Sequence, residues 1–108
     1  MATLINRAFE QCPNTKVVIS GYSQGAQLVH NAAGKLNAAT AAKITASVVF
    51  GDPKKGDPVG AVSASNVLTI CHAGDNICAG GILVLPPHLT YGMDAIAAAA
   101  FVKSKTGL

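Results

Sequence analysis

The chain of 108 residues is predicted to fold as one α/β domain with a parallel β-sheet covered by helices on both faces. Two observations predict this fold class. Apolar runs typical of strands occur at residues 16–20, 45–50 and 66–71, and helical patterns alternate with them along the chain. Strands that are apolar throughout, rather than on alternate residues, are typical of parallel sheets with both faces covered. A three-layer sandwich of helices, sheet and helices is the expected result.

The elements of the N-terminal part follow from apolar spacing. The first helix is predicted at residues 2–11, where an amphipathic pattern places Leu4, Ile5, Ala8 and Phe9 on one face. The β-branched run Val17-Val18-Ile19 predicts the first strand. The next helix, residues 24–36, carries an apolar face made of Ala26, Leu28, Val29, Ala32, Ala33 and Leu36.

The remaining elements are punctuated by turn residues. An alanine-rich stretch at residues 38–43 predicts a short helix, and the apolar strand at 45–50 ends in the turn signal Gly51-Asp52-Pro53. The third strand, at 66–71, is followed by a loop between two cysteines. A final helix is predicted at about 90–104, and its core-facing residues are expected to be Ile96, Ala97, Ala100 and Phe101.

The segment Gly21-Tyr22-Ser23-Gln24-Gly25 is the most informative motif of the chain. It fits G-x-S-x-G, the nucleophile elbow, in which a serine stands on a sharp turn between a strand and a helix. The two glycines allow neighbouring backbone to pass close to that turn. The helix that follows directs free N–H groups and its positive dipole end toward a developing oxyanion. The motif predicts a serine hydrolase with Ser23 as nucleophile.

A serine nucleophile needs a histidine base and an acid, which follow it in that fold in the chain order serine, acid, histidine. Asp75 is the favoured acid because it comes after the third strand, in the segment Cys71-His72-Ala73-Gly74-Asp75-Asn76-Ile77-Cys78. Asp52 follows the second strand and stays as an alternative, although Gly51-Asp52-Pro53 also fits a simple turn. Asp57 is interpreted as a surface turn residue.

His88 is the favoured base among the three histidines. It follows Pro86-Pro87, which restrict the backbone and so hold the loop stiff. The alternative for His88 is a cap on the final helix. His30 lies about two helical turns after the nucleophile and points away from it, so it is interpreted as a surface or packed helix residue. His72 is too close to Asp75 in sequence to come from a separate loop, and is interpreted as a loop or supporting residue.

Taken together, these segments resemble those of the cutinases, small secreted serine esterases of fungi and actinobacteria. The resemblance runs from about Phe9 to the end of the chain. It rests on Gly21-Tyr22-Ser23-Gln24-Gly25-Ala26, on Phe50-Gly51-Asp52-Pro53, on the two cysteines that bracket Gly74-Asp75, and on His88-Leu89-Thr90-Tyr91. The cysteine-bracketed Gly-Asp pair is far more specific than the elbow.

The resemblance implies a cutinase-like α/β-hydrolase fold and a role for particular residues. Ser23 is implied as nucleophile, Asp75 as acid and His88 as base, with the backbone N–H of Gln24 as one oxyanion donor. A disulfide between Cys71 and Cys78 is implied around the acid. No cofactor is implied. The implied reaction is hydrolysis of carboxylic esters in cutin-like polyesters and in short or medium acyl esters, with an acetylxylan esterase-type relative as the alternative.

The apolar loop before His88 allows two interpretations. As the resemblance implies, Ile82, Val84 and Leu89 would line an open apolar rim that binds acyl chains of a substrate at an apolar interface. Ordinary core packing is the other interpretation, and the sequence does not separate the two.

Residues 1–108 are expected to form only the C-terminal half of a cutinase domain, because cutinases carry a further N-terminal segment with a signal peptide and the first strands. Cys12 matches a family cysteine whose partner lies in that segment. Asn6, Arg7 and Glu10 interrupt any signal-like apolar run here. The resemblance implies a secreted, monomeric parent protein. The rival hypothesis is a catalytically incomplete remnant of the family.

Composition excludes several other classes of function. Half of the residues are apolar, only 12% are charged, and the net charge of +3 comes from scattered lysines. A basic stripe with interleaved aromatic residues is absent, which argues against a nucleic-acid partner. The histidines and cysteines lack zinc-site spacing, so no metal is expected. An apolar stretch of the ~20 residues needed to span a bilayer is also absent.

Overall fold

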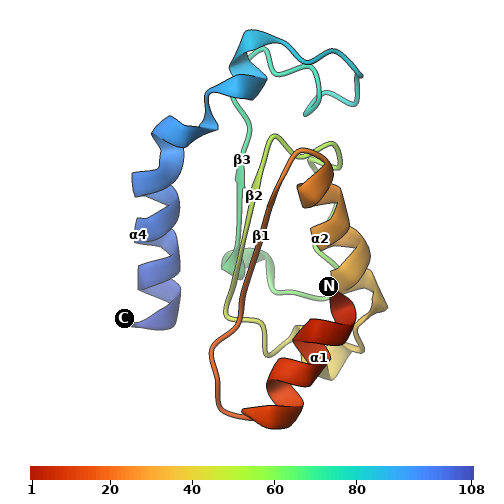
Figure 1. The fold of residues 1–108 in the computed structure, drawn as a ribbon, viewed down its shortest axis with the longest axis vertical. Coiled ribbons are helices and arrows are strands. Elements are labelled where there is room, and N and C mark those ends of the chain that lie inside the picture. Colours follow the sequence, from red (N-terminus) through yellow and green to blue (C-terminus); the bar gives the residue numbers. More distant parts are fainter.

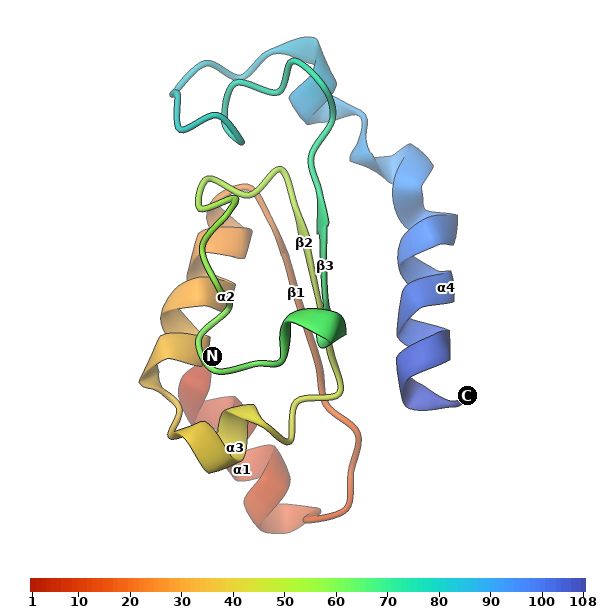
Figure 2. The same ribbon diagram turned by 180° about the vertical axis from the view of Figure 1, so that it is seen from behind.

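The computed structural model describes all 108 residues and has three layers. Its sheet has three parallel strands in the order β1-β2-β3, formed by Val18–Tyr22, Ala46–Phe50 and Val67–Ile70. Helices α1 (Ala2–Gln11) and α2 (Gln24–Lys35) lie on one side of the sheet, and α4 (Ala95–Thr106) lies on the other (Figures 1 and 2). The predicted fold class is confirmed.

The strands pair in the order of the sequence. Val18 of β1 lies beside Ala46 of β2, and Ser47 of β2 lies beside Val67 of β3. The central strand β2 is buried along nearly its whole length, which explains its continuous apolar sequence. The predicted strands 16–20, 45–50 and 66–71 differ from the observed ones by one or two residues at their ends, because ladder pairing rather than apolar character sets each limit.

The core lies between the sheet and α2. Its largest members include Ile44, Val29 and Val49, each at most 1% exposed. Helix α2 buries the predicted residues Ala26, Val29, Ala32 and Ala33. Leu28 is 53% exposed, so its assignment to the buried face was wrong. The buried positions of α2 are spaced three and four residues apart, and position 28 falls to one side of that stripe.

In the N-terminal helix α1, Ile5 is the buried residue, and Leu4 on the predicted apolar face is 65% exposed. The short helix α3 (Ala38–Ala41) lies within the predicted range of 38–43. Asn37 caps it by accepting a hydrogen bond from the N–H of Thr40 at 2.8 Å. None of the helices is both long enough and apolar enough to cross a membrane.

The last helix differs most from its prediction. Two short 3₁₀ turns, η2 (Pro86–Leu89) and η3 (Tyr91–Asp94), precede α4, which therefore begins at Ala95 instead of near residue 90. The predicted core face was wrong: Ile96 is 85% exposed, Ala97 and Ala100 are exposed, and Phe101 is half-buried. Ala98, Val102 and Thr106 line a cavity against the sheet instead. Apolar residues occur on all sides of α4, so its sequence pattern does not distinguish the face that packs against the sheet.

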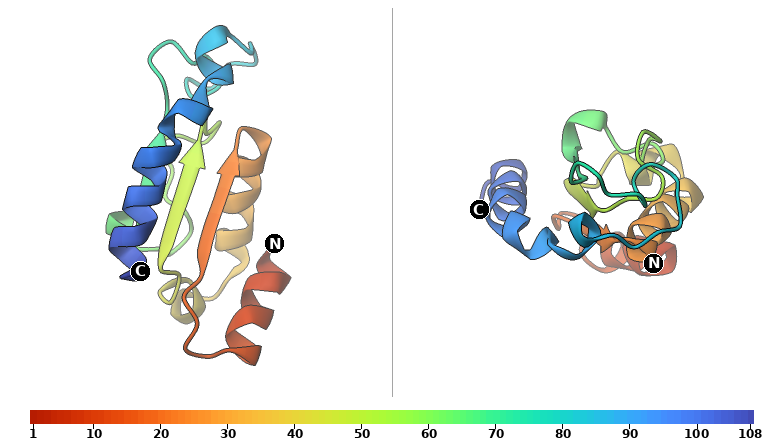
Figure 3. Two further views of the ribbon diagram at one scale, coloured as in Figure 1. Left: turned by 60° about the vertical axis from the view of Figure 1, so that its left-hand side comes forward. Right: turned by 90° about the horizontal axis from the view of Figure 1, so that it is seen from above.

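Because the strands are parallel, their carboxyl ends meet at one edge of the sheet, at the top of Figure 1. Ser23 follows β1 there, the loop beginning at Gly51 follows β2, and the cysteine-bounded loop follows β3. The turn η2 lies above the same edge, as the side view in Figure 3 also shows. Ligand sites of open α/β sheets lie at this edge.

Candidate active site

Ser23 stands on the turn between β1 and α2 and is the only residue other than glycine with a positive φ, +58°. Its N–H donates a hydrogen bond to the carbonyl of Phe50 at 2.9 Å. A Cβ atom on Gly21 would lie 2.3 Å from the carbonyl oxygen of Gly25, so the helix backbone passes as closely as the motif predicts. At Gly25 the corresponding prediction was wrong, since a Cβ there would meet nothing within 4 Å.

His88 lies in η2 and is almost completely buried, with 2% of its surface exposed. Its Nε2 lies 2.9 Å from Oγ of Ser23. The ring of Tyr22 stacks on the imidazole with centroids 5.0 Å apart, and the Tyr22 hydroxyl donates to the His88 carbonyl at 2.7 Å. The alternative that His88 caps the final helix was wrong, because Asp94 occupies that position. Stacking and hydrogen bonding together hold the imidazole beside the serine.

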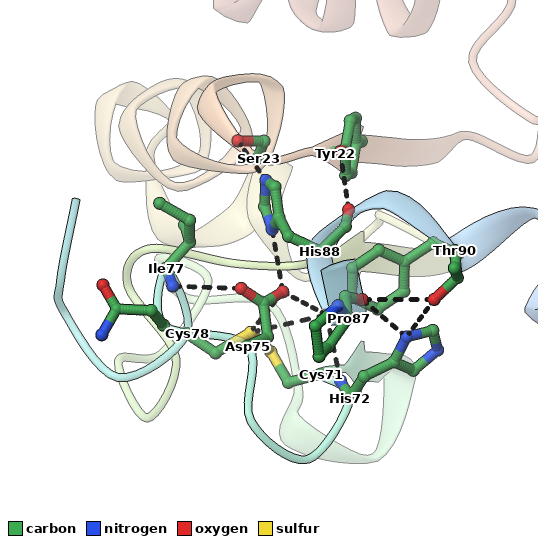
Figure 4. Close-up of polar contacts among 12 residues, drawn as sticks. Tyr22, Ser23, Cys71, His72, Asp75, Ile77, Cys78, Pro87, His88 and Thr90 are labelled. Carbon is green, nitrogen blue, oxygen red and sulfur yellow. Dashed lines mark hydrogen bonds and ion pairs between the residues drawn. A yellow bond between two sulfur atoms is a disulfide. The ribbon is translucent and has the colours of Figure 1, made fainter. Parts of the chain in front are cut away.

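Asp75 completes a chain of hydrogen bonds with Ser23 and His88, which Figure 4 shows in close-up. Nδ1–H of His88 donates to Asp75 Oδ2 at 2.8 Å, and the N–H of Ile77 donates to Oδ1 at 3.0 Å. The Tyr91 hydroxyl donates to Oδ2 at 2.5 Å. Burial alone would raise the pKa of Asp75, but the hydrogen bonds from Tyr91, His88 and Ile77 outweigh it and lower that pKa.

The loop that carries Asp75 is closed by the predicted disulfide between Cys71 and Cys78, whose Cα atoms are 6.2 Å apart. Asp75 lies between the two cysteines, so the cross-link fixes the ends of the segment that presents the carboxylate. Cys12 is free and exposed.

His72 and Tyr91 support this arrangement from outside, and their rings stack with centroids 4.0 Å apart. The N–H of His72 donates to the Tyr91 hydroxyl at 3.0 Å, and its Nδ1–H donates to the Pro87 carbonyl at 2.8 Å. Its Nε2 forms an ion pair with Asp94. The hydrogen bond to Asp94, and then the one to Pro87, raise the pKa of His72. Burial and the hydrogen bond to Asp75 raise the pKa of Tyr91 to about 12.

Asp52, the alternative acid, does not share a hydrogen bond with His88. It pairs instead with His30, whose Nε2 lies 2.5 Å from Asp52 Oδ2. His30 is packed inside the protein, in agreement with one of its two predicted interpretations. Asp57 is exposed, as expected of a turn residue. Two histidine–aspartate pairs are thus buried near the sheet edge, and only one of them includes the serine.

A cavity of about 410 Å³ opens beside His88 and is lined by Tyr22, Phe50, Leu89, Tyr91 and the start of α4. Leu89 is 66% exposed, whereas Ile82 and Val84 are 90% and 59% exposed and lie outside the lining of this cavity. Core packing of these three residues, one of the two predicted alternatives, was wrong. The site thus has an apolar, solvent-open wall next to the imidazole.

Gln24 begins α2, directly after the serine. The first N–H groups of a helix have no acceptor within the helix, so the Gln24 N–H is available to an oxyanion at Ser23. No group of three or more His, Cys, Asp or Glu side chains gathers at a spacing suited to a metal ion. The contacts of Ser23, His88 and Asp75 are those that can activate a serine hydroxyl.

Comparison with known proteins agrees with the resemblance that the motifs suggested. The family model described as "Cutinase" matches residues 1–106. The chain belongs to the cutinase family. The curated cutinase of Monilinia fructicola is 64% identical over 107 residues, which cover 99% of this chain and 53% of that protein. The cutinase of Botryotinia fuckeliana is 64% identical over 108 residues, or 100% of this chain and 54% of that protein.

A solved cutinase structure has the same fold. Trichoderma reesei cutinase, in complex with a C11Y4 phosphonate inhibitor, matches with a TM-score of 0.91 and 57% sequence identity. The match covers 94% of this chain and 47% of that one. The chain therefore has the cutinase type of α/β fold and spans about half the length of the curated cutinases of Monilinia fructicola and Botryotinia fuckeliana.

The role of Tyr91 and the pairing of His30 with Asp52 were not predicted from the sequence. Tyr91 appeared only as part of the cutinase motif His88-Leu89-Thr90-Tyr91, and its position three residues after His88 was the available signal. The pairing of His30 with Asp52 had no local signal, because the two residues are 22 positions apart and lie on different elements.

Proposed function

We propose that this cutinase-family chain is a serine esterase that hydrolyses carboxylic esters, with Ser23 as nucleophile, His88 as base and Asp75 as acid. The observation that carries the proposal is the continuous chain of hydrogen bonds between the three side chains, 2.9 Å from serine to imidazole and 2.8 Å from imidazole to carboxylate. This order of nucleophile, base and acid is that of the serine hydrolases.

The proposed reaction follows from these contacts. Ser23 Oγ attacks the ester carbonyl while His88 Nε2 takes the hydroxyl proton. The oxyanion of the tetrahedral intermediate accepts a hydrogen bond from the Gln24 N–H. His88 then returns the proton to the leaving alcohol, and water, activated by the same imidazole, releases the acyl group. Asp75 keeps the proton on Nδ1 and stabilises the imidazolium. No cofactor takes part in these steps.

The proposed substrates are cutin-like polyesters and short or medium acyl esters, met at an apolar interface. Support comes from the name shared by the curated relatives and from the exposed apolar side chains of Ile82, Val84 and Leu89. We assign these three residues to acyl binding; of the three, Leu89 lines the cavity beside His88. The disulfide is typical of proteins from oxidising compartments, so we propose an extracellular protein, monomeric like the parent family implied by the motifs.

Two alternatives differ from this proposal in turnover or in the acyl group accepted. A catalytically incomplete cutinase remnant would have the assembled triad and little turnover, and the Gln24 N–H is the one oxyanion donor assigned at Ser23. An acetylxylan esterase-type preference would share the triad and differ in the acyl group accepted.

The test is covalent labelling combined with turnover. A fluorophosphonate probe is expected to label the wild-type chain on Ser23, as located by peptide mapping, and p-nitrophenyl acetate, butyrate and octanoate measure hydrolysis. Ser23→Ala is expected to remove labelling and to lower kcat by at least ~10³-fold. Ser63→Ala, at an exposed serine distant in sequence, is the control.

Each outcome has a distinct meaning. Labelling at Ser23 with turnover supports the esterase, and labelling without turnover supports the remnant. Turnover confined to the acetyl ester supports the acetylxylan esterase-type relative. An adduct on another serine, or normal turnover by Ser23→Ala, contradicts the proposed nucleophile.

A further inference from the structure

The second buried histidine–aspartate pair joins α2 to the loop after β2. His30 and Asp52 are 7% and 1% exposed, and their side chains lie 2.5 Å apart. Nδ1–H of His30 donates to the carbonyl of Pro58 at 3.1 Å, and the N–H of Lys54 donates to Asp52 Oδ1 at 2.8 Å. One side chain of α2 therefore holds both ends of the loop between Asp52 and Pro58.

This loop begins at the wall against which the His88 ring rests. Gly51 precedes Asp52, has a φ of +55°, and lies so close to the imidazole that a Cβ would be 2.8 Å from Cε1 and 2.9 Å from Nδ1 of His88. Phe50, one residue earlier, accepts the hydrogen bond from the N–H of Ser23. A displacement of Asp52 would thus be transmitted through adjacent backbone to both the base and the nucleophile.

We propose that the His30–Asp52 pair is a positioning device for His88, acting through Gly51; the proposal rests on the esterase function proposed above. Removal of His30 leaves the buried carboxylate of Asp52 without its imidazole partner and the Pro58 carbonyl without its donor. Buried charges that lose their partner are strongly unfavourable, so the loop moves to hydrate them. A shift of Gly51 of about 1 Å is enough to misalign the imidazole, and such misplacement costs about 10²-fold in rate.

The kinetic test uses the full chain and four variants. His30→Ala and Asp52→Ala are expected to lower kcat on p-nitrophenyl butyrate by ~10–100-fold, with KM changed by no more than about threefold. Asp52→Asn should retain kcat within about threefold. The amide N–H of the new side chain can donate to Nε2 of His30, and its carbonyl oxygen can accept from the N–H of Lys54. The Nδ1–H of His30 still donates to the Pro58 carbonyl.

Ile44→Ala is the matched control for lost stability. Ile44 is 1% exposed and lies in the hydrophobic core, and it makes none of the site's hydrogen bonds. Thermal unfolding of each variant identifies a temperature at which all are folded, and kcat is compared there. If His30→Ala does not fold, His30→Gln replaces it. The glutamine amide can donate to only one of the two groups that His30 contacts, the Asp52 carboxylate or the Pro58 carbonyl.

A spectroscopic readout decides the proposal even if the chain turns over no ester. The Nδ1–H proton of His88, hydrogen-bonded to Asp75, is expected as a slowly exchanging low-field proton signal in the wild type, Asp52→Asn and Ile44→Ala. It should be lost by exchange in His30→Ala and Asp52→Ala. If the wild type shows the signal without hydrolysis, the esterase function fails while the positioning role is still decided.

Three results would overturn the positioning role. The first is a His30→Ala variant that keeps both its kcat, where the chain is active, and the His88 signal. The second is an Ile44→Ala variant that loses both to the same extent. The third is an Asp52→Asn variant as impaired as Asp52→Ala, which would rule out the hydrogen bonds as its basis.

Discussion

Tyr91 donates its hydroxyl hydrogen to Oδ2 of Asp75 at 2.5 Å, and Nδ1 of His88 binds the same oxygen at 2.8 Å. The other carboxylate oxygen accepts from the backbone N–H of Ile77. A buried carboxylate is unfavourable when its charge is uncompensated. Three donors converge on Asp75, and its ionised form is therefore stable inside the protein, with a lowered pKa.

Tyr91→Phe is expected to destabilise the protein by about 1.5–3 kcal/mol at pH 7, because a hydrogen bond to a charged group is lost. Stability contributed by Asp75 is present above its unfolded pKa and is lost as the pH falls through its lowered folded pKa. The variant should therefore differ less from the wild type at pH 3 than at pH 7. Urea unfolding at both pH values measures this, and a difference that does not depend on pH would contradict it.

Tyr22→Phe is the matched control for that experiment. Its hydroxyl donates to the His88 carbonyl rather than to a carboxylate. The stability lost in Tyr22→Phe should therefore be similar at pH 3 and pH 7.

The ion pair of His72 with Asp94 predicts a pH dependence of the opposite sign. The pKa of His72 is raised, so its contribution to stability is complete below the unfolded value of 6.5 and disappears as the pH rises through the folded value. Asp94→Asn should weaken this loss, which is measured by urea midpoints at pH 5.5, 7 and 8.5. Asp57→Asn, at an exposed aspartate, is the control and should keep the wild-type dependence.

Loss of the disulfide is expected to affect the site more than the fold. The chain-entropy estimate for so short a loop is only ~2–3 kcal/mol, yet the loop carries Asp75. The paired change Cys71→Ala with Cys78→Ala should therefore lower esterase activity under conditions in which circular dichroism shows a folded chain. Cys12→Ser, at an exposed free thiol, should change neither quantity. Equal activity in the double variant and the wild type would refute this role of the cross-link.

The two glycines of the elbow should respond differently to alanine. Gly21→Ala places a methyl group 2.3 Å from the Gly25 carbonyl oxygen, so the turn must open and both folding and activity should suffer. Gly25→Ala meets open space within α2 and should stabilise the helix by roughly 0.5–1 kcal/mol. Thermal unfolding of the two variants tests the contrast, and similar midpoints would show that the close approach at Gly21 is unimportant.

Local patterns in the sequence predicted the three strands, the order of elements and the assembly of Ser23, Asp75 and His88. Each of these features can be inferred from a short segment of sequence alone: an apolar run, a nucleophile-elbow motif, or two cysteines on either side of an aspartate. Parallel pairing then brings the strand ends together without further information.

The features that escaped prediction depend on packing between distant segments. Packing against its neighbours decides which face of α4 lies toward the sheet, since the exposed Ile96 is no less apolar than Ala98 and Val102, which line the cavity against the sheet. His30 and Asp52 meet only because α2 packs beside the loop after β2. The helical and strand periodicity of the sequence does not predict that contact.

The positive φ of Ser23 lowers the stability of the turn that carries it. A serine in this conformation costs of order 1–3 kcal/mol of backbone energy, whereas glycine adopts it freely. A Ser23→Gly variant is therefore expected to unfold at a higher temperature than the wild type. Stability alone would therefore favour glycine at position 23, and a strained backbone is the condition for holding a hydroxyl group at this edge of the sheet.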